Sequence, residues 1–262
     1  MPRTLAAPLA PPLAAPSLAL LVTEPLRALF DYASSRVGAG AHKLGDGHPV
    51  IVYPGLGGGA FTTSQLRRYL AESGFAPHDW GQGVNTGPVG DLDTWLGTLE
   101  KQVDELYAAH GRKVSLVGWS LGGIYARELA KRMPGKVRQV ITLGTPFGAL
   151  GEANHASRVY RLLNGDTAQL TPQLQARLRR PPNVPTTSIY SRSDGVVCWQ
   201  GCVEKDGPRS ESIEITASHL GMVSHPGVLR TVAERLAQRE GRWRAAAARA
   251  VRPASRSSRP AR

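Results

Sequence analysis

A serine, an aspartate and a histidine follow one another along this chain in contexts that suit nucleophilic chemistry. Ser120 lies in "GWSLGG", between the apolar run "KVSLV" and the helix-like "IYARELAKRM". Asp194 comes just after the apolar segment "VPTTSIYS", and His219 comes directly after "SIEITAS". A serine hydroxyl is a poor nucleophile at neutral pH, so it needs a base, and the base needs an acid that orients it. These three residue types therefore predict acyl transfer through a covalent intermediate on Ser120.

The neighbours of Ser120 distinguish a nucleophile from a serine in an ordinary tight turn. The pattern G-x-S-x-G is common by chance, but here it follows a predicted strand and precedes a predicted helix, which is the context of a nucleophile elbow. Gly118 and Gly122 would let that strand and helix approach each other closely. We therefore expect Ser120 to have a strained backbone conformation and to present Oγ to a cleft.

Two histidines near the end of the chain compete for the role of base. His225 precedes Pro226 and the predicted last helix, so it is typical of a residue at a helix entry. His219 directly follows a strand, and the order Ser, Asp, His with both partners at later strand ends is the one expected for such a site. We predict His219 as the base and Asp194 as the acid, although S-D-G is also a turn signature.

The oxyanion of a tetrahedral intermediate needs two backbone N–H donors. We expect one from Leu121, the residue after the nucleophile, and one from Leu56 in the glycine-rich loop "YPGLGGG". That loop has neither the G-K-[ST] ending of a P-loop nor the G-x-G-x-x-G of a dinucleotide site. We therefore predict no nucleotide site, no metal and no cofactor.

The segments around these residues alternate between strand and helix. Apolar, β-branched runs lie at 49–55, 113–120, 136–146, 184–197 and 212–219, and amphipathic segments lie at 62–74, 93–111, 123–133 and 227–237. With 41% hydrophobic and 20% charged residues, the 262-residue chain has the composition of a globular protein. The alternation predicts an α/β fold with a mostly parallel central sheet and helices on both faces.

Four stretches resemble the α/β-hydrolase superfamily, particularly its lipase and esterase branches, over roughly residues 47–238. They are "YPGLGGG" as the oxyanion loop, "GWSLGG" as the elbow, "RSDGVV" as the acid and "SHLGM" as the histidine. "SHLGMVSHP" is also similar to the H-x-G-L-x-x-P form of bacterial lipase-like hydrolases, whereas Tyr53 and Pro54 replace the H-G common before the glycines.

This resemblance implies an α/β-hydrolase domain that cleaves carboxylic esters of small molecules or lipids as a carboxylesterase or lipase, without a cofactor. Two other functions stay open at this point. One is an acyltransferase or thioesterase with the same three residues, and the other is a non-catalytic binding or scaffold protein of the same fold.

One insertion and two terminal segments differ from the predicted domain at 47–238. Residues 151–182 add helical sequence where a short connection would suffice, so we predict a candidate lid there. Residues 1–46 predict a flexible leader and an N-terminal helix near 25–36, whose apolar face we expect to pack on the domain. Residues 239–262 hold eight arginines and one acid, +7 of the formal +12, and predict a disordered basic tail.

The same terminal segments bear on location and partners. Prolines interrupt the apolar N-terminal residues and Glu24 closes the short run "LALLV", so we predict a cytoplasmic protein without a signal peptide or membrane span. The tail could make weak contact with an anionic or membrane surface, and we expect no specific nucleic acid. Cys198 and Cys202 are too few for a zinc site, while a local disulfide and two thiols both stay open.

Overall fold

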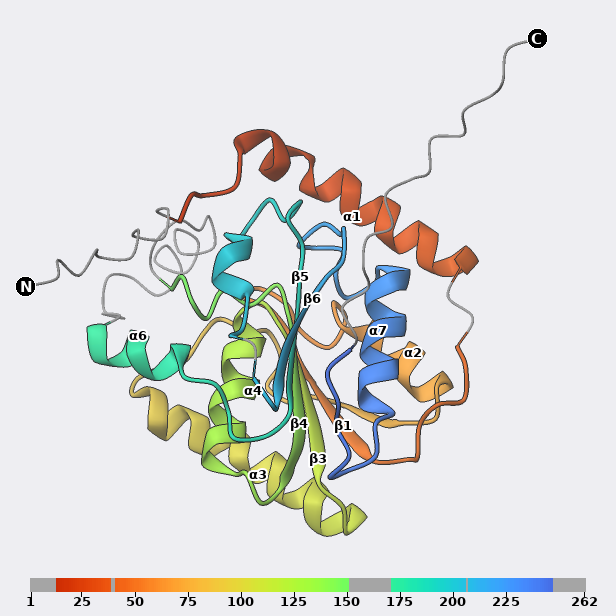
Figure 1. The fold of residues 1–262 in the computed structure, drawn as a ribbon, viewed down its shortest axis with the longest axis vertical. Helices are drawn as coiled ribbons and strands as arrows, with labels where there is room; N and C mark the ends of the chain where they lie inside the picture. The colour runs from red at the N-terminus through yellow and green to blue at the C-terminus, as the bar shows by residue number, and fades with distance from the viewer. Residues whose placement is uncertain (1–12, 39–40, 151–170, 206, 247–262) are drawn as a thin grey trace, which may run out of the picture.

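The computed structural model describes residues 13–38, 41–150, 171–205 and 207–246 and is built on a six-stranded sheet (Figure 1). The strands run in the order β2-β1-β3-β4-β5-β6, and every neighbouring pair is parallel. Their bounds are Pro49–Tyr53 (β1), Ala76–Asp79 (β2), Val114–Trp119 (β3), Val137–Leu143 (β4), Thr186–Tyr190 (β5) and Ser210–Glu214 (β6). The predicted α/β fold with a parallel sheet is confirmed.

Helices cover both faces of this sheet and enclose one hydrophobic core on each. The helices α2 (Ser64–Glu72) and α7 (Pro226–Leu236) contribute to one core, and α3 (Leu92–His110), α4 (Leu121–Arg132) and α6 (Pro172–Arg179) contribute to the other. Within β1, Val50 and Val52 face the first core while Ile51 and Tyr53 face the second. Because both sides of each central strand are buried, the strands appear in the sequence as continuous apolar runs.

The helix α1 (Leu18–Gly38) lies apart from these two layers and passes over the loops that follow β5 and β6 (Figure 1). It begins at Leu18 rather than near Pro25, because Ser17 Oγ accepts the Leu20 N–H at its first turn. Pro25 lies inside the helix.

The exposed side of α1 contradicts one expectation. Leu26, Leu29 and Phe30 were expected to pack on the domain, yet they are 64%, 63% and 71% exposed. The side of α1 that turns inward carries Glu24 and Ser35 instead, both buried. The 3.6-residue period predicted the helix correctly, but it does not say which of two faces meets the rest of the protein.

β2 was not predicted, because "APHD" contains no β-branched residue. Residues 151–170 of the expected lid and 247–262 of the basic tail lie outside the described residues. The described remainder of that insertion, α6, contacts α4 through an ion pair between Arg177 and Glu128. None of the helices in the described ranges has the length and apolar character needed to cross a bilayer.

The two cysteines lie in and beside a short 3₁₀ helix at Trp199–Cys202. Both are buried thiols. Cys198 Sγ donates to Gln200 Oε1 at 2.9 Å, and Cys202 Sγ donates to the carbonyl of Cys198 at 3.7 Å. Burial raises the pKa of the Cys202 thiol well above its ordinary value, so this sulfur stays protonated and unreactive.

Candidate active site

Ser120 occupies the sharp turn between β3 and α4. Among the described residues, it is the one non-glycine residue with a positive φ, at φ 53° and ψ −121°. Such a conformation costs free energy and persists only where surrounding contacts enforce it. A Cβ added to Gly118 would lie 2.4 Å from the Gly122 carbonyl oxygen, and one added to Gly122 would lie 2.5 Å from that of Tyr53. Close backbone packing therefore holds the turn, and it requires glycine at both positions.

The side chains of Ser120, His219 and Asp194 form one hydrogen-bonded chain. His219 Nε2 lies 3.1 Å from Ser120 Oγ, and His219 Nδ1 lies 2.6 Å from Asp194 Oδ2. The second carboxylate oxygen of Asp194 accepts the N–H groups of Val196 and Val197, each at 2.8 Å. The structure thus brings together three residues that come from the ends of β3, β5 and β6.

The charges around His219 favour its protonated form. Burial alone would lower the pKa of His219. The charge of Asp194, its hydrogen bond to Nδ1 and the charge of Glu24 act in the opposite sense and raise the pKa above 6.5. An imidazole with these neighbours can take up a proton from a hydroxyl that it already contacts.

His225, the alternative base, has a different position. It is the N-cap of α7, where its Nδ1 accepts the Gly227 N–H at 3.1 Å. The nitrogen that would have to accept a proton from a serine is therefore engaged with the helix terminus.

Leu56 and Leu121 lie on the two backbone segments that flank Ser120. Leu56 is in the loop after β1, and Leu121 is the first residue of α4. Within the part of the chain that the structure describes, no hydrogen bond engages the N–H of either residue. The N-terminal end of a helix also carries a partial positive charge.

Asn85 supports this loop and was not predicted from the sequence. Its carbonyl accepts the Gly57 N–H at 2.7 Å, its N–H donates to the Gly58 carbonyl at 2.7 Å, and its Nδ2 donates to that of Pro54 at 2.8 Å. The Tyr125 hydroxyl in turn donates to Asn85 Oδ1 at 3.0 Å. The sequence gives only a weak indication of this role, because the residues that Asn85 bonds lie far from it along the chain.

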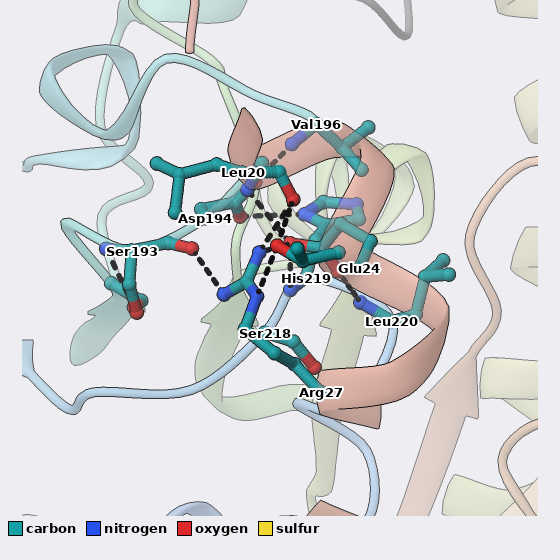
Figure 2. Close-up of polar contacts among 12 residues, drawn as sticks. Leu20, Glu24, Arg27, Ser193, Asp194, Val196, Ser218, His219 and Leu220 are labelled. Atoms are coloured by element: carbon teal, nitrogen blue, oxygen red, sulfur yellow. Dashed lines mark hydrogen bonds and ion pairs between the residues drawn. The ribbon is translucent and has the colours of Figure 1, made fainter. Parts of the chain in front are cut away.

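Glu24 is the second unpredicted residue at the site. Figure 2 shows its carboxylate among the backbone of the loops that carry Asp194 and His219. In the sequence, Glu24 marks only the end of an apolar run. The signal available was an acid directly after the apolar first turns of this helix.

Metal binding has no support in the described ranges, where no cluster of three or more His, Cys, Asp or Glu side chains could hold an ion.

Comparison with known proteins shows which family the sequence of this chain matches. Residues 48–260 match the family model described as "Alpha/beta hydrolase family". The chain is 28% identical over 120 residues to the phosphatidylcholine-sterol acyltransferase of Mus musculus. The aligned region covers 44% of this chain and 25% of that protein. The chain is also 27% identical over 104 residues to the pimeloyl-[acyl-carrier protein] methyl ester esterase of Shewanella woodyi, in an alignment that covers 39% and 38%. The matches therefore span well under half the length of these curated relatives.

Solved structures share the fold at low identity. A Bacillus licheniformis lipase in its mature form superposes with a TM-score of 0.55 at 19% identity, covering 76% of this chain and 96% of that one. An Aspergillus fumigatus lipase gives a TM-score of 0.53 at 16% identity, covering 78% and 57%. At such identities the likeness concerns the fold alone.

Proposed function

This chain belongs to the alpha/beta hydrolase family, and from that premise we propose that it is a serine hydrolase that cleaves carboxylic esters. The observation that carries the proposal is that a continuous chain of hydrogen bonds runs from Asp194 through His219 to a serine, Ser120, at the turn between β3 and α4. The strained turn at Ser120 supports it, since strain of this kind collects at functional positions.

In the proposed first step, Ser120 Oγ attacks the ester carbonyl carbon while its proton moves to His219 Nε2. Asp194 keeps the proton of His219 on Nδ1, so the nitrogen that faces Ser120 is the one with a lone pair. The raised pKa of His219 favours the imidazolium that exists while the tetrahedral intermediate persists.

The backbone N–H groups of Leu56 and Leu121 are the proposed donors to the oxyanion. Each such donor contributes about 3 kcal/mol to lowering the barrier in related chemistry. His219 then protonates the leaving alcohol, which leaves an acyl group on Ser120. A water molecule, deprotonated by His219, attacks that ester and releases the acid.

Two tryptophans lie close in sequence to the proposed site residues, Trp119 beside Ser120 and Trp199 after Asp194. Trp119 packs in the core between β3 and α7, and its Nε1 donates to the His219 carbonyl at 3.0 Å. Trp199 stacks on Tyr190 with ring centroids 5.6 Å apart. Both tryptophans, which could have lined an acyl pocket, thus have structural partners.

Acyl transfer is a second candidate function, favoured by the similarity to an acyltransferase. The same acyl-enzyme on Ser120 would serve, with an acceptor alcohol in place of water in the second step. The two reactions differ only in what reaches the acyl-enzyme.

The proposal is tested by Ser120→Ala against p-nitrophenyl esters of increasing acyl length. We expect a loss of at least ~10³-fold in kcat and loss of labelling by a fluorophosphonate. Ser73→Ala is the matched control, because Ser73 is also buried and its hydroxyl donates to the Tyr69 carbonyl of α2 at 2.8 Å. Undiminished turnover in Ser120→Ala would remove the assignment, and faster product formation with added alcohols than with water alone would favour acyl transfer.

A further inference from the structure

Glu24 is an unusual residue for the helix that carries it. Charged side chains on a surface helix normally face water, yet Glu24 is 1% exposed while Leu26 and Leu29 of the same helix are exposed. Burying a carboxylate is unfavourable unless hydrogen bonds and an opposite charge compensate for lost water. The hydrogen-bond and ion-pair partners of Glu24 therefore show how its burial is compensated.

Three backbone N–H groups from two loops meet this one carboxylate. Oε1 accepts the N–H of Gly195 at 2.7 Å and that of His219 at 3.1 Å, and Oε2 accepts that of Leu220 at 3.1 Å. Gly195 is the residue after Asp194, and Leu220 is the residue after His219. One side chain thus joins the loop of the acid to the loop of the base (Figure 2).

Arg27 supplies the opposite charge and adds a fourth connection. Its Nη2 lies 2.8 Å from Glu24 Oε1, and its Nη1 donates to the Ser193 carbonyl at 2.6 Å. Ser193 is the residue before Asp194. The acid loop is therefore held on both sides of Asp194 by one turn of α1.

Close packing sets the distance between α1 and these loops. A Cβ added to Gly195 would lie 2.5 Å from the Leu20 carbonyl oxygen, which belongs to the α1 backbone. Asp31, further along α1, accepts both the N–H and the hydroxyl of Ser218, at 3.0 and 2.6 Å. The residue before His219 is thus fixed by the same helix.

From these contacts we propose that Glu24 is a positioning residue, whose buried carboxylate holds the Asp194 and His219 loops in register with each other. The proposal rests on the proposed function of the site. Without Glu24, the three N–H groups would lose their common acceptor, and the 2.6 Å contact between Asp194 and His219 would depend on two loops that could shift separately. Misplacement of about 1 Å at a catalytic group can cost ~10²-fold in rate.

Glu24 also acts on His219 through its charge. The groups that face His219 are Asp194 from the loop after β5, Glu24 from α1 and the neutral Ser120, while Arg27 offsets part of the Glu24 charge. Burial lowers the pKa of His219, and the charges of Asp194 and Glu24 raise it. Removing the negative charge at position 24 should therefore lower this pKa.

The experiment is Glu24→Gln in the full chain. The amide fills the same space but sets an N–H₂ donor against a backbone N–H, so we expect kcat to fall ~10- to 100-fold with KM for a short ester unchanged. The acid limb of the kcat/KM profile should move to lower pH. An NMR titration of the His219 ring should show the same lowered pKa without any need for turnover.

Glu128→Gln is the matched control. Glu128 is another buried carboxylate paired with partly exposed cations, Lys131 and Arg177, but it lies about two turns along α4 from the elbow. We expect it to lower stability and to leave kcat and the His219 titration as they are. Val22→Ala, on the exposed side of α1, should change neither.

Several outcomes would overturn the proposal. A folded Glu24→Gln protein with unchanged kcat and His219 titration would do so, as would an equal loss of kcat in Glu128→Gln. If Glu24→Gln does not fold, Gly195→Ala decides, because its methyl group separates α1 from the acid loop while Glu24 is kept: unchanged kcat there counts against positioning. Absence of turnover and labelling in the wild type would instead defeat the proposed function. The NMR titration tests the effect of Glu24 on His219 independently of that function.

Discussion

Among the described residues, one Ser-His-Asp hydrogen-bonded chain lies at each end of the sheet, and their differences bear on why we propose only one of them as reactive. At the amino end, His48 Nε2 lies 2.8 Å from Ser115 Oγ, and His48 Nδ1 lies 2.5 Å from Asp46 Oδ1. At the carboxyl end, the corresponding distances around His219 are 3.1 and 2.6 Å. Residue types and hydrogen-bond lengths alone therefore do not identify a nucleophile.

The backbone is the first difference. Ser115 is inside β3, paired with Val50 of β1 and Gln139 of β4, and it is fully buried. Ser120 lies one residue past the end of β3, at a positive φ and directly before α4. Of these two serines, only Ser120 therefore lies beside backbone N–H groups that are outside the sheet ladder and could donate hydrogen bonds to an oxyanion.

The charges around each histidine are the second difference. Asp46 is paired with Arg112 and Arg138, at 2.6 and 3.1 Å. Burial, together with these two arginines, lowers the pKa of His48 to about 4 against the raising effect of Asp46. Burial lowers the pKa of His219 as well, but the charge of Asp194, its hydrogen bond to Nδ1 and the charge of Glu24 outweigh burial and raise it. His48 is therefore the weaker base of the two.

The largest expected contrast between the two ends is in turnover. We expect His219→Gln to lower kcat at least ~10³-fold, because the base is lost. His48→Gln should leave kcat unchanged and cost about 1–3 kcal/mol of stability, since a buried polar network loses a partner. Ester hydrolysis at saturating substrate and chemical denaturation of both variants measure the two effects.

The opposite ranking of these variants would make the amino-end chain the reactive one. Equal losses of turnover would mean that both act through stability alone.

A smaller contrast is expected from two glycines that each pack against backbone. A Cβ at Gly122 would lie 2.5 Å from the Tyr53 oxygen, and one at Gly45 would lie 2.4 Å from the Gly74 carbonyl. Overpacking of this kind costs about 1–3 kcal/mol in either Gly122→Ala or Gly45→Ala. Only Gly122→Ala should also lower kcat, by ~10- to 100-fold, because it moves the elbow relative to the Leu56 loop.

Thermal unfolding and kcat on the same preparations separate the two glycine effects. A Gly45→Ala protein with the greater kinetic loss would contradict the comparison.

A last contrast concerns the pH dependence of stability. The folded pKa of His48 is about 4 and its ordinary value is 6.5, so the unfolded chain binds the proton more tightly. His48 therefore contributes stability that is present above pH 6.5 and is lost as the pH falls toward 4, by about 3 kcal/mol. The raised pKa of His219 has the opposite sign: its contribution is present below 6.5 and is lost as the pH rises through the folded value.

Urea denaturation at pH 7 and pH 4.5 tests this sign. The stability lost by the wild type between these two pH values should be smaller in His48→Gln. An unchanged or larger loss in that variant would show that His48 is not the group responsible.

The sequence predicted the fold better than it predicted the support of the site. Apolar runs and helical periods located every strand except β2, which is a short polar edge strand. The preference for His219 over His225 followed from the strand end, and the structure has His219 beside Ser120 and His225 at the start of α7. Asn85 and Glu24 could not be found this way, because their partners lie far along the chain and leave no periodic pattern.

The sequence by itself determined the parallel sheet, the glycine-flanked turn at Ser120 and the positions of Asp194 and His219 after later strands. These are local properties, since apolar period, turn chemistry and strand ends are written within a few residues. The tertiary structure alone decided that His48 lies between Ser115 and Asp46, which face of α1 turns inward and what Glu24 contacts. Those outcomes depend on the burial of charge and on hydrogen bonds between distant segments, which exist only after the chain has folded.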